Sequence, residues 1–184
     1  MIKLYGGAMS RASIVKWYLE ELQAPYEFQL LDMKAGEHLQ PDFLGINPFG
    51  KVPAIADGDF QLWESGAILL YLADKYEQMK TVEARAIASQ WVLFANATLG
   101  TGLFVAESRE KETPRLLGGL NKILENQTYL AGDLFTVSDV AVGTILGYAV
   151  LMLKMSYADY PAIEAYMKRI GDRPAYQKAI LGIS

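Results

Sequence analysis

The chain contains no cysteine and a single histidine, His38. Without cysteine it can form no disulfide bond, offers no protein thiol as a nucleophile and cannot ligate a metal ion through thiolates. Any sulfur chemistry that the protein performs must therefore arrive with a ligand. We expect no bound metal.

A long apolar run and an excess of positive charge are also missing. No apolar run reaches the roughly 18 residues of a membrane-spanning helix, and the N-terminus, MIKLYGGAMSRAS, lacks the features of a signal peptide. The net charge of -4 argues against nucleic acid, because affinity for nucleic acid depends on clustered lysine and arginine. We therefore expect a cytoplasmic protein with neither a membrane nor a nucleic-acid partner.

The N-terminal region is predicted to form a strand, a helix and a second strand. Residues 2–5 suit a short strand, and the glycines of GGAMS permit a tight turn after it. From Ser10 the apolar residues recur at helical spacing until Pro25, and residues 26–30 alternate apolar and polar side chains as a half-buried strand does. The two strands should be parallel, with a right-handed crossover between them.

The stretch GKVPAIADGDFQLWES at residues 50–65 predicts a β-hairpin followed by a helix that ends near Tyr76. Pro53 lies in the first strand of this hairpin. Because proline cannot donate to a sheet ladder, it belongs at the first residue of a strand, at an edge or at a bulge. The element order is therefore βαβ followed by ββα, in a domain that spans residues 1–77.

The second half shows only helical patterns. Residues 77–82 form a short linker, and Thr136 with Asp139 matches a capping box, flanked by Phe135 and Val140 as a hydrophobic staple. We predict an all-helical domain over residues 83–184. Its expected helices cover 83–106, 112–127, 137–154 and 160–170, with a last one after Pro174.

The combined pattern resembles the cytosolic glutathione S-transferases. The residues that carry the resemblance are NPFGKVPAI at 47–55, WESGAI at 63–68, GEHL at 36–39 before PDFLGINP, and TVSD at 136–139. The resemblance implies a thioredoxin-like α/β N-terminal domain, an all-α C-terminal domain and glutathione as co-substrate. The short chain looks most like compact bacterial forms such as the chi class.

The resemblance implies that two parts of the first domain bind glutathione. It implies that the Val52-Pro53 bond is cis and that the Val52 backbone pairs with glutathione as an added strand. Ser65 and Glu64, at a helix start, would bind the γ-glutamyl carboxylate. From the residues alone, Pro53 is better explained as a trans proline that opens a strand. Ser65 is equally consistent with a helix cap.

Two basic residues match the glycine end of glutathione in the resembling family. Lys51 precedes the Val-Pro pair, and His38 lies in the loop after the second strand. Taken by itself, a lone loop histidine is more often simply solvated.

The thiol of glutathione must lose its proton to act as a nucleophile. Ser10, at the start of the first helix, is the first candidate for a hydrogen bond to sulfur, and Arg11 would assist by charge or by its own hydrogen bond. The competing role of Ser10 is to cap that helix. Ser13 and Tyr5 are weaker candidates. Met9 stands where beta-type bacterial members carry a cysteine, so a mixed disulfide with the enzyme is excluded.

We therefore predict a glutathione transferase that conjugates glutathione to small hydrophobic electrophiles in detoxification, and the resemblance implies a homodimer. The electrophile would lie against the second domain, near Leu103, Phe104 and Met152, although such residues are usually core. A non-catalytic glutathione-binding or scaffold protein, and glutathione-dependent peroxide reduction, remain alternatives. The family's frequent ESRAI is ESGAI here; Gly66 replaces an arginine often found near the subunit interface.

Overall fold

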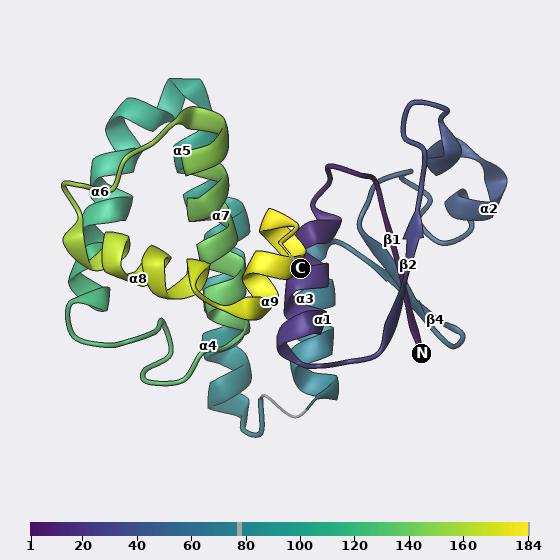
Figure 1. Ribbon diagram of the computed structural model, residues 1–184, viewed down its shortest axis with the longest axis horizontal. Coiled ribbons are helices and arrows are strands. Elements are labelled where there is room, and N and C mark those ends of the chain that lie inside the picture. Colours follow the sequence, from purple (N-terminus) through teal and green to yellow (C-terminus); the bar gives the residue numbers. More distant parts are fainter. Residues whose placement is uncertain (77–78, 184) are drawn as a thin grey trace. The chain divides into compact units, whose positions relative to one another are not determined.

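The computed structural model describes residues 1–76 and 79–183 of the 184 in the chain. The chain divides into two compact units (Figure 1). One contains Met1–Tyr76 together with Pro174–Ser184, and the other contains Glu77–Arg173. Glu77, where the first predicted domain ends, Gln78 in the predicted linker, and Ser184 lie outside the described residues.

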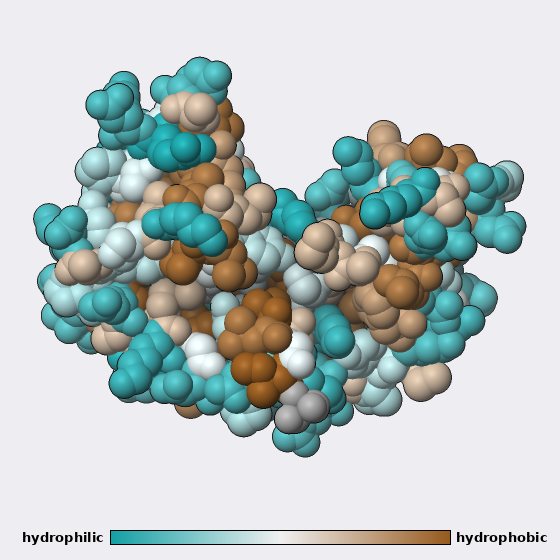
Figure 2. Space-filling model, turned by 45° about the horizontal axis from the view of Figure 1, so that its top comes forward, coloured by the Kyte–Doolittle hydropathy of each residue, from teal (hydrophilic) through white to brown (hydrophobic). Residues whose placement is uncertain are grey.

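Hydrophobic residues reach the surface in several places. On the face shown in Figure 2 they lie among hydrophilic residues. Among the described helices, none has the length and apolar character needed to cross a membrane.

The first unit is built on a mixed four-stranded sheet in the order β2-β1-β3-β4. β1 is parallel to β2, whereas the β1–β3 and β3–β4 pairs are antiparallel. The predicted α/β domain with βαβ-ββα order is thus confirmed. The strands are β1 (Ile2–Gly6), β2 (Tyr26–Leu30), β3 (Ala54–Asp57) and β4 (Phe60–Trp63).

Two helices, α1 (Ala12–Glu21) and α3 (Ser65–Lys75), pack side by side on one face of this sheet (Figure 1). Their apolar stripes join Leu4 and Ile55 in a core whose side chains are almost wholly buried. Burial of such stripes is what stabilises short helices of this kind. The connection from β2 to β3 contains only a 3-10 turn, η1 (Glu37–Leu39), and a single-turn helix, α2 (Pro41–Leu44).

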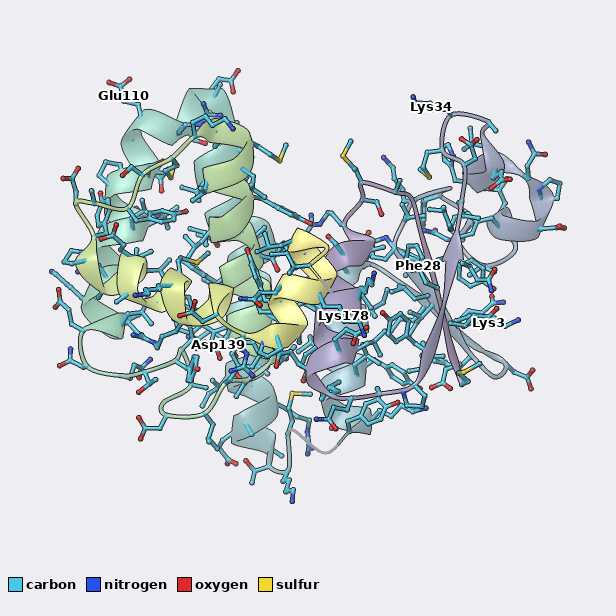
Figure 3. The ribbon with its side chains drawn as sticks, in the orientation of Figure 1. Lys3, Phe28, Lys34, Glu110, Asp139 and Lys178 are labelled. Carbon is cyan, nitrogen blue, oxygen red and sulfur yellow. The ribbon has the colours of Figure 1, made fainter. Side chains whose placement is uncertain are left out.

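The C-terminal segment packs on α1 of the first unit. It comprises α9 (Pro174–Tyr176) and the π-helical turn η3 (Gln177–Leu181). The Tyr176 ring meets the buried Trp17 ring edge-on, with the ring centroids 4.9 Å apart. Lys178, which is labelled in Figure 3, bonds Glu20 Oε2 through Nζ at 2.7 Å. A helix after Pro174 was expected, but within the 83–184 domain. Here the segment after Pro174 belongs to the first unit, so the end of the helical unit differs from the expected boundary.

The second unit is helical, as predicted, and α7 lies at its centre with α4, α5 and α8 around it. The predicted single helix over 83–106 is wrong at its end, because Val105 is extended (φ -82°, ψ 117°) and separates two helices. The helices of this unit are α4 (Val82–Leu93), the π-helical η2 (Phe94–Leu99), α5 (Gly100–Phe104), α6 (Ala106–Leu124), α7 (Val137–Leu153) and α8 (Pro161–Gly171).

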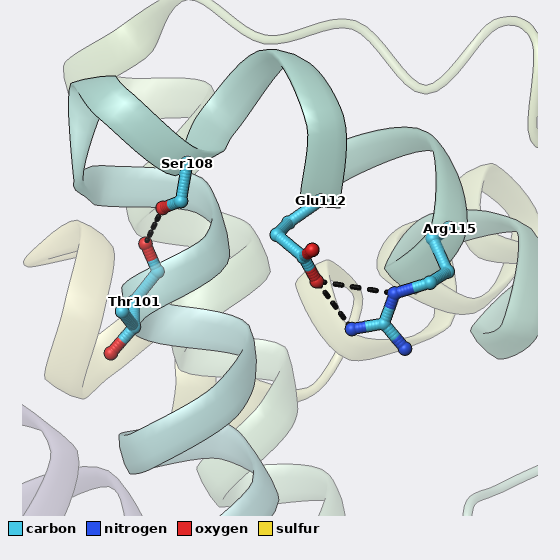
Figure 4. A network of polar contacts seen from close by, with 4 residues as sticks. All are labelled: Thr101, Ser108, Glu112 and Arg115. Carbon is cyan, nitrogen blue, oxygen red and sulfur yellow. Dashed lines mark hydrogen bonds and ion pairs between the residues drawn. The ribbon is translucent and has the colours of Figure 1, made fainter.

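Side chains of α6 explain the break at Val105. Arg109 Nε donates to the Leu103 carbonyl at 2.6 Å and its Nη2 to the Phe104 carbonyl at 3.1 Å, so the guanidinium satisfies carbonyls that the end of α5 leaves free. The Ser108 hydroxyl also donates to the Thr101 carbonyl at 3.2 Å (Figure 4). α6 therefore starts six residues before the predicted position of 112, and Pro114 lies inside it.

The predicted capping box at the start of α7 is confirmed. Asp139, fully buried among the helices of this unit (Figure 3), accepts the Leu130 amide at 2.9 Å, the Thr136 amide at 2.8 Å and the Tyr166 hydroxyl at 3.0 Å. Burial raises the pKa of the Asp139 carboxyl, and these hydrogen bonds oppose the rise. One carboxylate thus joins α7, α8 and the loop between α6 and α7.

Replacing Asp139 by alanine should destabilise the protein strongly. Three donors, two of them buried, would lose their acceptor. Each buried loss costs about 1 to 3 kcal/mol, so we expect the free energy of unfolding to fall by about 3 kcal/mol or more. Urea unfolding followed by circular dichroism measures this. Asp159→Ala, at an exposed carboxylate, is the control and should change stability little. Equal stability of the two variants would contradict the role given to Asp139.

Candidate active site

A pocket of about 500 Å³ opens in the first unit, where the loop before β3 meets the starts of α1 and α3. Six of its lining residues were predicted from the sequence. These are Arg11, Lys51, Val52, Pro53, Glu64 and Ser65. Asn47, Phe49 and Trp63, to which no role was assigned, also line it.

The Val52 backbone forms an open edge of this pocket. The Val52-Pro53 bond is cis, as expected, and ladder pairing of β3 with β1 starts only at Ala54, opposite Tyr5. Within the described part of the chain, no group hydrogen-bonds to the Val52 amide or carbonyl. An extended peptide placed here would find one donor and one acceptor.

Asn47 fixes the loop that leads to Val52. Its side chain is buried, and Nδ2 donates to the Lys51 carbonyl at 2.7 Å while Oδ1 accepts the Phe49 amide at 3.1 Å. Gly50 adopts φ 59°, and a Cβ there would lie 3.0 Å from the His38 carbonyl. Sequence reasoning missed Asn47, although asparagine that bonds the backbone two residues on is a known turn former.

The opposite wall is the start of α3. Glu64 has φ 72° and ψ 116°, an unusual conformation for a residue with a side chain, and it occupies the N-cap position without a side-chain cap bond. Ser65 is the first helical residue, with 6% of its surface exposed. The alternative that Ser65 caps this helix is wrong. No described residue bonds its hydroxyl, which leaves that hydroxyl beside the helix's free amides.

Ser10 and Arg11 differ in how they relate to the pocket. The Ser10 hydroxyl donates to the Gly7 carbonyl at 3.0 Å and accepts the Gly7 amide at 3.1 Å and the Ala12 amide at 3.3 Å. Ser10 thus organises the turn before α1 and does not line the pocket. Arg11, at the N-cap position of α1, does line it.

The other residues predicted to contact glutathione or the electrophile do not line this pocket. His38 is half-buried in η1, and its Nδ1 is buried with no partner among the described residues. In the helical unit Leu103 is fully buried, whereas Met152 is 69% exposed and Phe104 is the last residue of α5. Leu103 is therefore a core residue of its own unit.

The pocket combines groups suited to an anionic peptide. Its edge offers backbone pairing, the start of α3 offers donors for a carboxylate, and Arg11 and Lys51 bring two positive charges. Over residues 1–76 and 79–183, no cluster of three or more His, Cys, Asp or Glu side chains could hold a metal ion. The backbone edge, the helix start and the two basic side chains of this pocket suit a peptide that carries carboxylates.

Comparison with known proteins identifies two family models in the chain. The N-terminal domain of glutathione S-transferase matches residues 1–74, and its C-terminal domain matches residues 104–174. The chain is 34% identical over 205 residues to the disulfide-bond oxidoreductase YfcG of Escherichia coli (strain K12), covering 98% of this chain and 95% of that protein. It is 32% identical over 209 residues to glutathione S-transferase 3 of Zea mays, covering 99% and 94%.

A solved structure agrees with these sequence matches. A glutathione transferase from Burkholderia graminis, with two glutathione molecules bound per subunit, superposes with a TM-score of 0.80 at 29% identity, covering 97% of this chain and 86% of that one. The thioredoxin-like and helical units, the family models and the relatives of similar length all agree. The chain belongs to the glutathione S-transferase family.

Proposed function

We propose that the protein conjugates the thiolate of glutathione to small hydrophobic electrophiles. The observation that carries this proposal is the pocket at Pro53, which is lined by both Val52 and Ser65. Among the described residues, neither the Val52 backbone nor the Ser65 hydroxyl has a hydrogen-bond partner. A tripeptide with a carboxylate at each end needs both features at once. Cytoplasmic location, detoxification and a homodimer remain predictions of the same proposal.

Each part of glutathione is assigned to one part of the pocket. The central cysteine residue pairs with the Val52 backbone beside Pro53, and the γ-glutamyl carboxylate lies against Ser65 at the α3 N-terminus, with Glu64 orienting that end. Lys51 attracts the glycine carboxylate. His38 is proposed to act at the same end from the neighbouring turn, whose His38 carbonyl lies 3.0 Å from the position that a Cβ on Gly50 would take.

For activation of sulfur, we favour Arg11 over Ser10 because Arg11 lines the pocket and Ser10 does not. A serine hydroxyl has one proton, and that of Ser10 points to the Gly7 carbonyl, so a bond to sulfur would break an existing one. Arg11 lines the pocket and carries a permanent positive charge. We propose that Arg11 stabilises the thiolate and that Ser10 holds the turn from which Arg11 extends.

The conjugation assay uses an aryl halide and an isothiocyanate with the wild type and Ser65→Ala. We expect turnover above the uncatalysed rate, and a rise in KM for glutathione of about tenfold in Ser65→Ala, because a hydrogen bond to a charged group contributes about 1.5 to 3 kcal/mol. Ser156→Ala, at an exposed serine of the other unit, is the control. Glutathione binding without turnover on a broad panel would favour the scaffold alternative and overturn the enzymatic proposal.

Substitutions at Arg11 and Ser10 separate the roles of these two residues. In Arg11→Gln the pKa of bound glutathione should rise by about one unit, since removing a charge worth about 1.4 kcal/mol to the thiolate shifts its pKa by that amount. The rising limb of kcat/KM against pH should move to higher pH by the same amount. Thiolate absorbance of the complex gives an independent reading. A larger shift in Ser10→Ala than in Arg11→Gln would assign the role to Ser10 instead.

Disulfide reduction is a second candidate function. One relative is named a disulfide-bond oxidoreductase, and the Burkholderia graminis structure holds two glutathione molecules per subunit. Since this chain has no cysteine, two glutathione molecules would have to supply both thiols. One forms a mixed disulfide with half of the substrate and releases the other half as a thiol; the second glutathione then releases the remaining thiol and leaves oxidised glutathione.

A small disulfide such as 2-hydroxyethyl disulfide tests this candidate. We expect one oxidised glutathione for each disulfide reduced, at a rate that depends on the second power of glutathione concentration below saturation. Ser65→Ala should slow this reaction and conjugation alike, because both use the same carboxylate site. Conjugation without any disulfide reduction would rule out this candidate. A peroxide assay run in parallel tests glutathione-dependent peroxide reduction.

A further inference from the structure

The first unit contains a second pocket, of about 450 Å³, that shares no lining residue with the proposed glutathione site. It lies on the face of the sheet opposite α1 and α3, where Figure 1 shows α2. Leu4 is buried in the core beneath α1 and α3. Because side chains alternate along a strand, the neighbouring Tyr5 points to the other face. There its ring meets the Phe43 ring of α2, with the ring centroids 5.8 Å apart.

The wall of this pocket is apolar. It is formed by Tyr5 at the end of β1, Leu31 just after β2, Phe43 of α2 and Ile46 just after α2. Phe43 keeps only 3% of its surface exposed, whereas the other three side chains are half-buried. The volume lies within the range of small-molecule pockets, about 300 to 1,000 Å³. Such a wall suits the apolar body of a small molecule.

The rim of the pocket carries two carboxylates and an amide. Glu37, Gln40 and Asp42 form it, and all three are exposed. Within residues 1–76 and 79–183, no basic side chain pairs with either carboxylate or lines the pocket. A carboxylate offers only acceptors. The rim therefore favours a ligand that brings a positive charge and N–H donors.

The turn that carries Glu37 is fixed by its own hydrogen bonds. Glu37 Oε2 accepts the Asp32 amide at 2.7 Å, and the Glu37 amide donates to the Asp32 carbonyl at 3.1 Å. Asp32 Oδ1 accepts the amides of Lys34 and Ala35 at 2.9 and 3.0 Å. Among the described residues nothing bonds Glu37 Oε1. The carboxylate is thus held at the rim with one oxygen left for a ligand, which lowers the cost of binding.

The lining favours an organic cation over a metal ion. Mg²⁺ and Ca²⁺ take about six to eight oxygen ligands. In the described part of the chain no cluster of three or more His, Cys, Asp or Glu side chains could hold a metal ion. An ammonium group needs fewer acceptors and is attracted to aromatic rings such as those of Tyr5 and Phe43. An apolar group attached to it would cover the wall.

We propose that this pocket binds a small primary ammonium ion with an apolar body. The ammonium group bonds Glu37 and Asp42 at the rim, and the apolar body lies against Tyr5, Leu31 and Ile46. This binding goes beyond the glutathione chemistry proposed above and does not depend on it.

The probe is 2-phenylethylammonium, with 2-phenylethanol as its neutral counterpart of similar size. Isothermal titration calorimetry measures both affinities, and we expect the ammonium ion to bind about tenfold more tightly, because its hydrogen bonds to carboxylates are charge-assisted. In a proton–nitrogen NMR spectrum it should shift the amide signals of Gln40 and Ile46 in a saturable way. Glutathione, in contrast, should shift those of Val52 and Ser65, so failure of one proposal is distinguishable from failure of the other.

Matched variants locate the ligand. Glu37→Gln keeps an oxygen for the Asp32 amide but removes the charge, and Asp42→Asn removes the second charge. Each should weaken the ammonium ion about threefold and the double variant about tenfold, with the alcohol unchanged, because exposed ion pairs contribute modestly. Glu27→Gln, at an exposed carboxylate of β2 outside the pocket, is the control. At 0.15 M salt it should alter binding less than about twofold, since distant exposed charges are screened.

A filling variant tests the apolar wall. Ile46→Trp places a large side chain in the pocket and should weaken the ammonium ion and the alcohol alike. Circular dichroism of each variant checks folding. Should Ile46→Trp fail to fold, the Glu37 and Asp42 variants still decide the question.

Three results would overturn the proposal. Equal affinity for the ammonium ion and the alcohol would remove the role of the carboxylates. A loss in Glu27→Gln as large as in Glu37→Gln would mean that only the overall negative charge attracts the probe. If the ammonium ion shifts no signal while a lysine-rich peptide shifts those of Gln40 and Ile46, the pocket is instead a docking surface for another protein.

Discussion

The pairing of β3 with β4 brings the two walls of the candidate site together. Ala54 lies opposite Trp63 in this antiparallel ladder, so Val52 and Pro53, just before Ala54, lie beside Glu64 and Ser65, just after Trp63. The register is fixed at the other end by a tight turn in which Gly58 has φ 63°. A slip by one residue would move Ile55 from the core to the opposite face, so core burial also secures the register.

Asn47 extends this constraint to the loop that carries Lys51. A buried amide side chain that uses both its donor and its acceptor cannot turn over without leaving polar atoms unpaired. The Lys51 carbonyl and the Phe49 amide are therefore held in place by the Asn47 side chain. This fixes the backbone direction at the end of the loop, just before Val52. Binding residues supported in this way need little ordering when a ligand arrives, which favours affinity.

Features that depend on residues close together in the sequence were predicted more successfully than features that depend on contacts between separate elements. The hairpin and the capping box at Thr136 were predictable because each depends on residues a few positions apart. The break at Val105 was not, because it depends on the Arg109 side chain turning back to α5. Packing of the C-terminal segment on α1 likewise depends on Trp17 meeting Tyr176. Most of the pocket residues came from the resemblance to a family, and Asn47 was missed although its bonds to Phe49 and Lys51 are local.

The absence of cysteine explains why this site consists so largely of backbone and fixed charge. A protein without its own thiol cannot hold glutathione covalently, so recognition must come from hydrogen bonds and charge that are in place before the ligand arrives. Glu64 shows what that requires. Its unusual φ ends β4 and starts α3 within a single residue, which places the first helical amides next to the Val52 edge. A relaxed conformation at Glu64 would lengthen this connection and separate the carboxylate site from the strand edge. In the proposed mode of binding one tripeptide reaches both, which makes the conformation of Glu64 a condition of that binding.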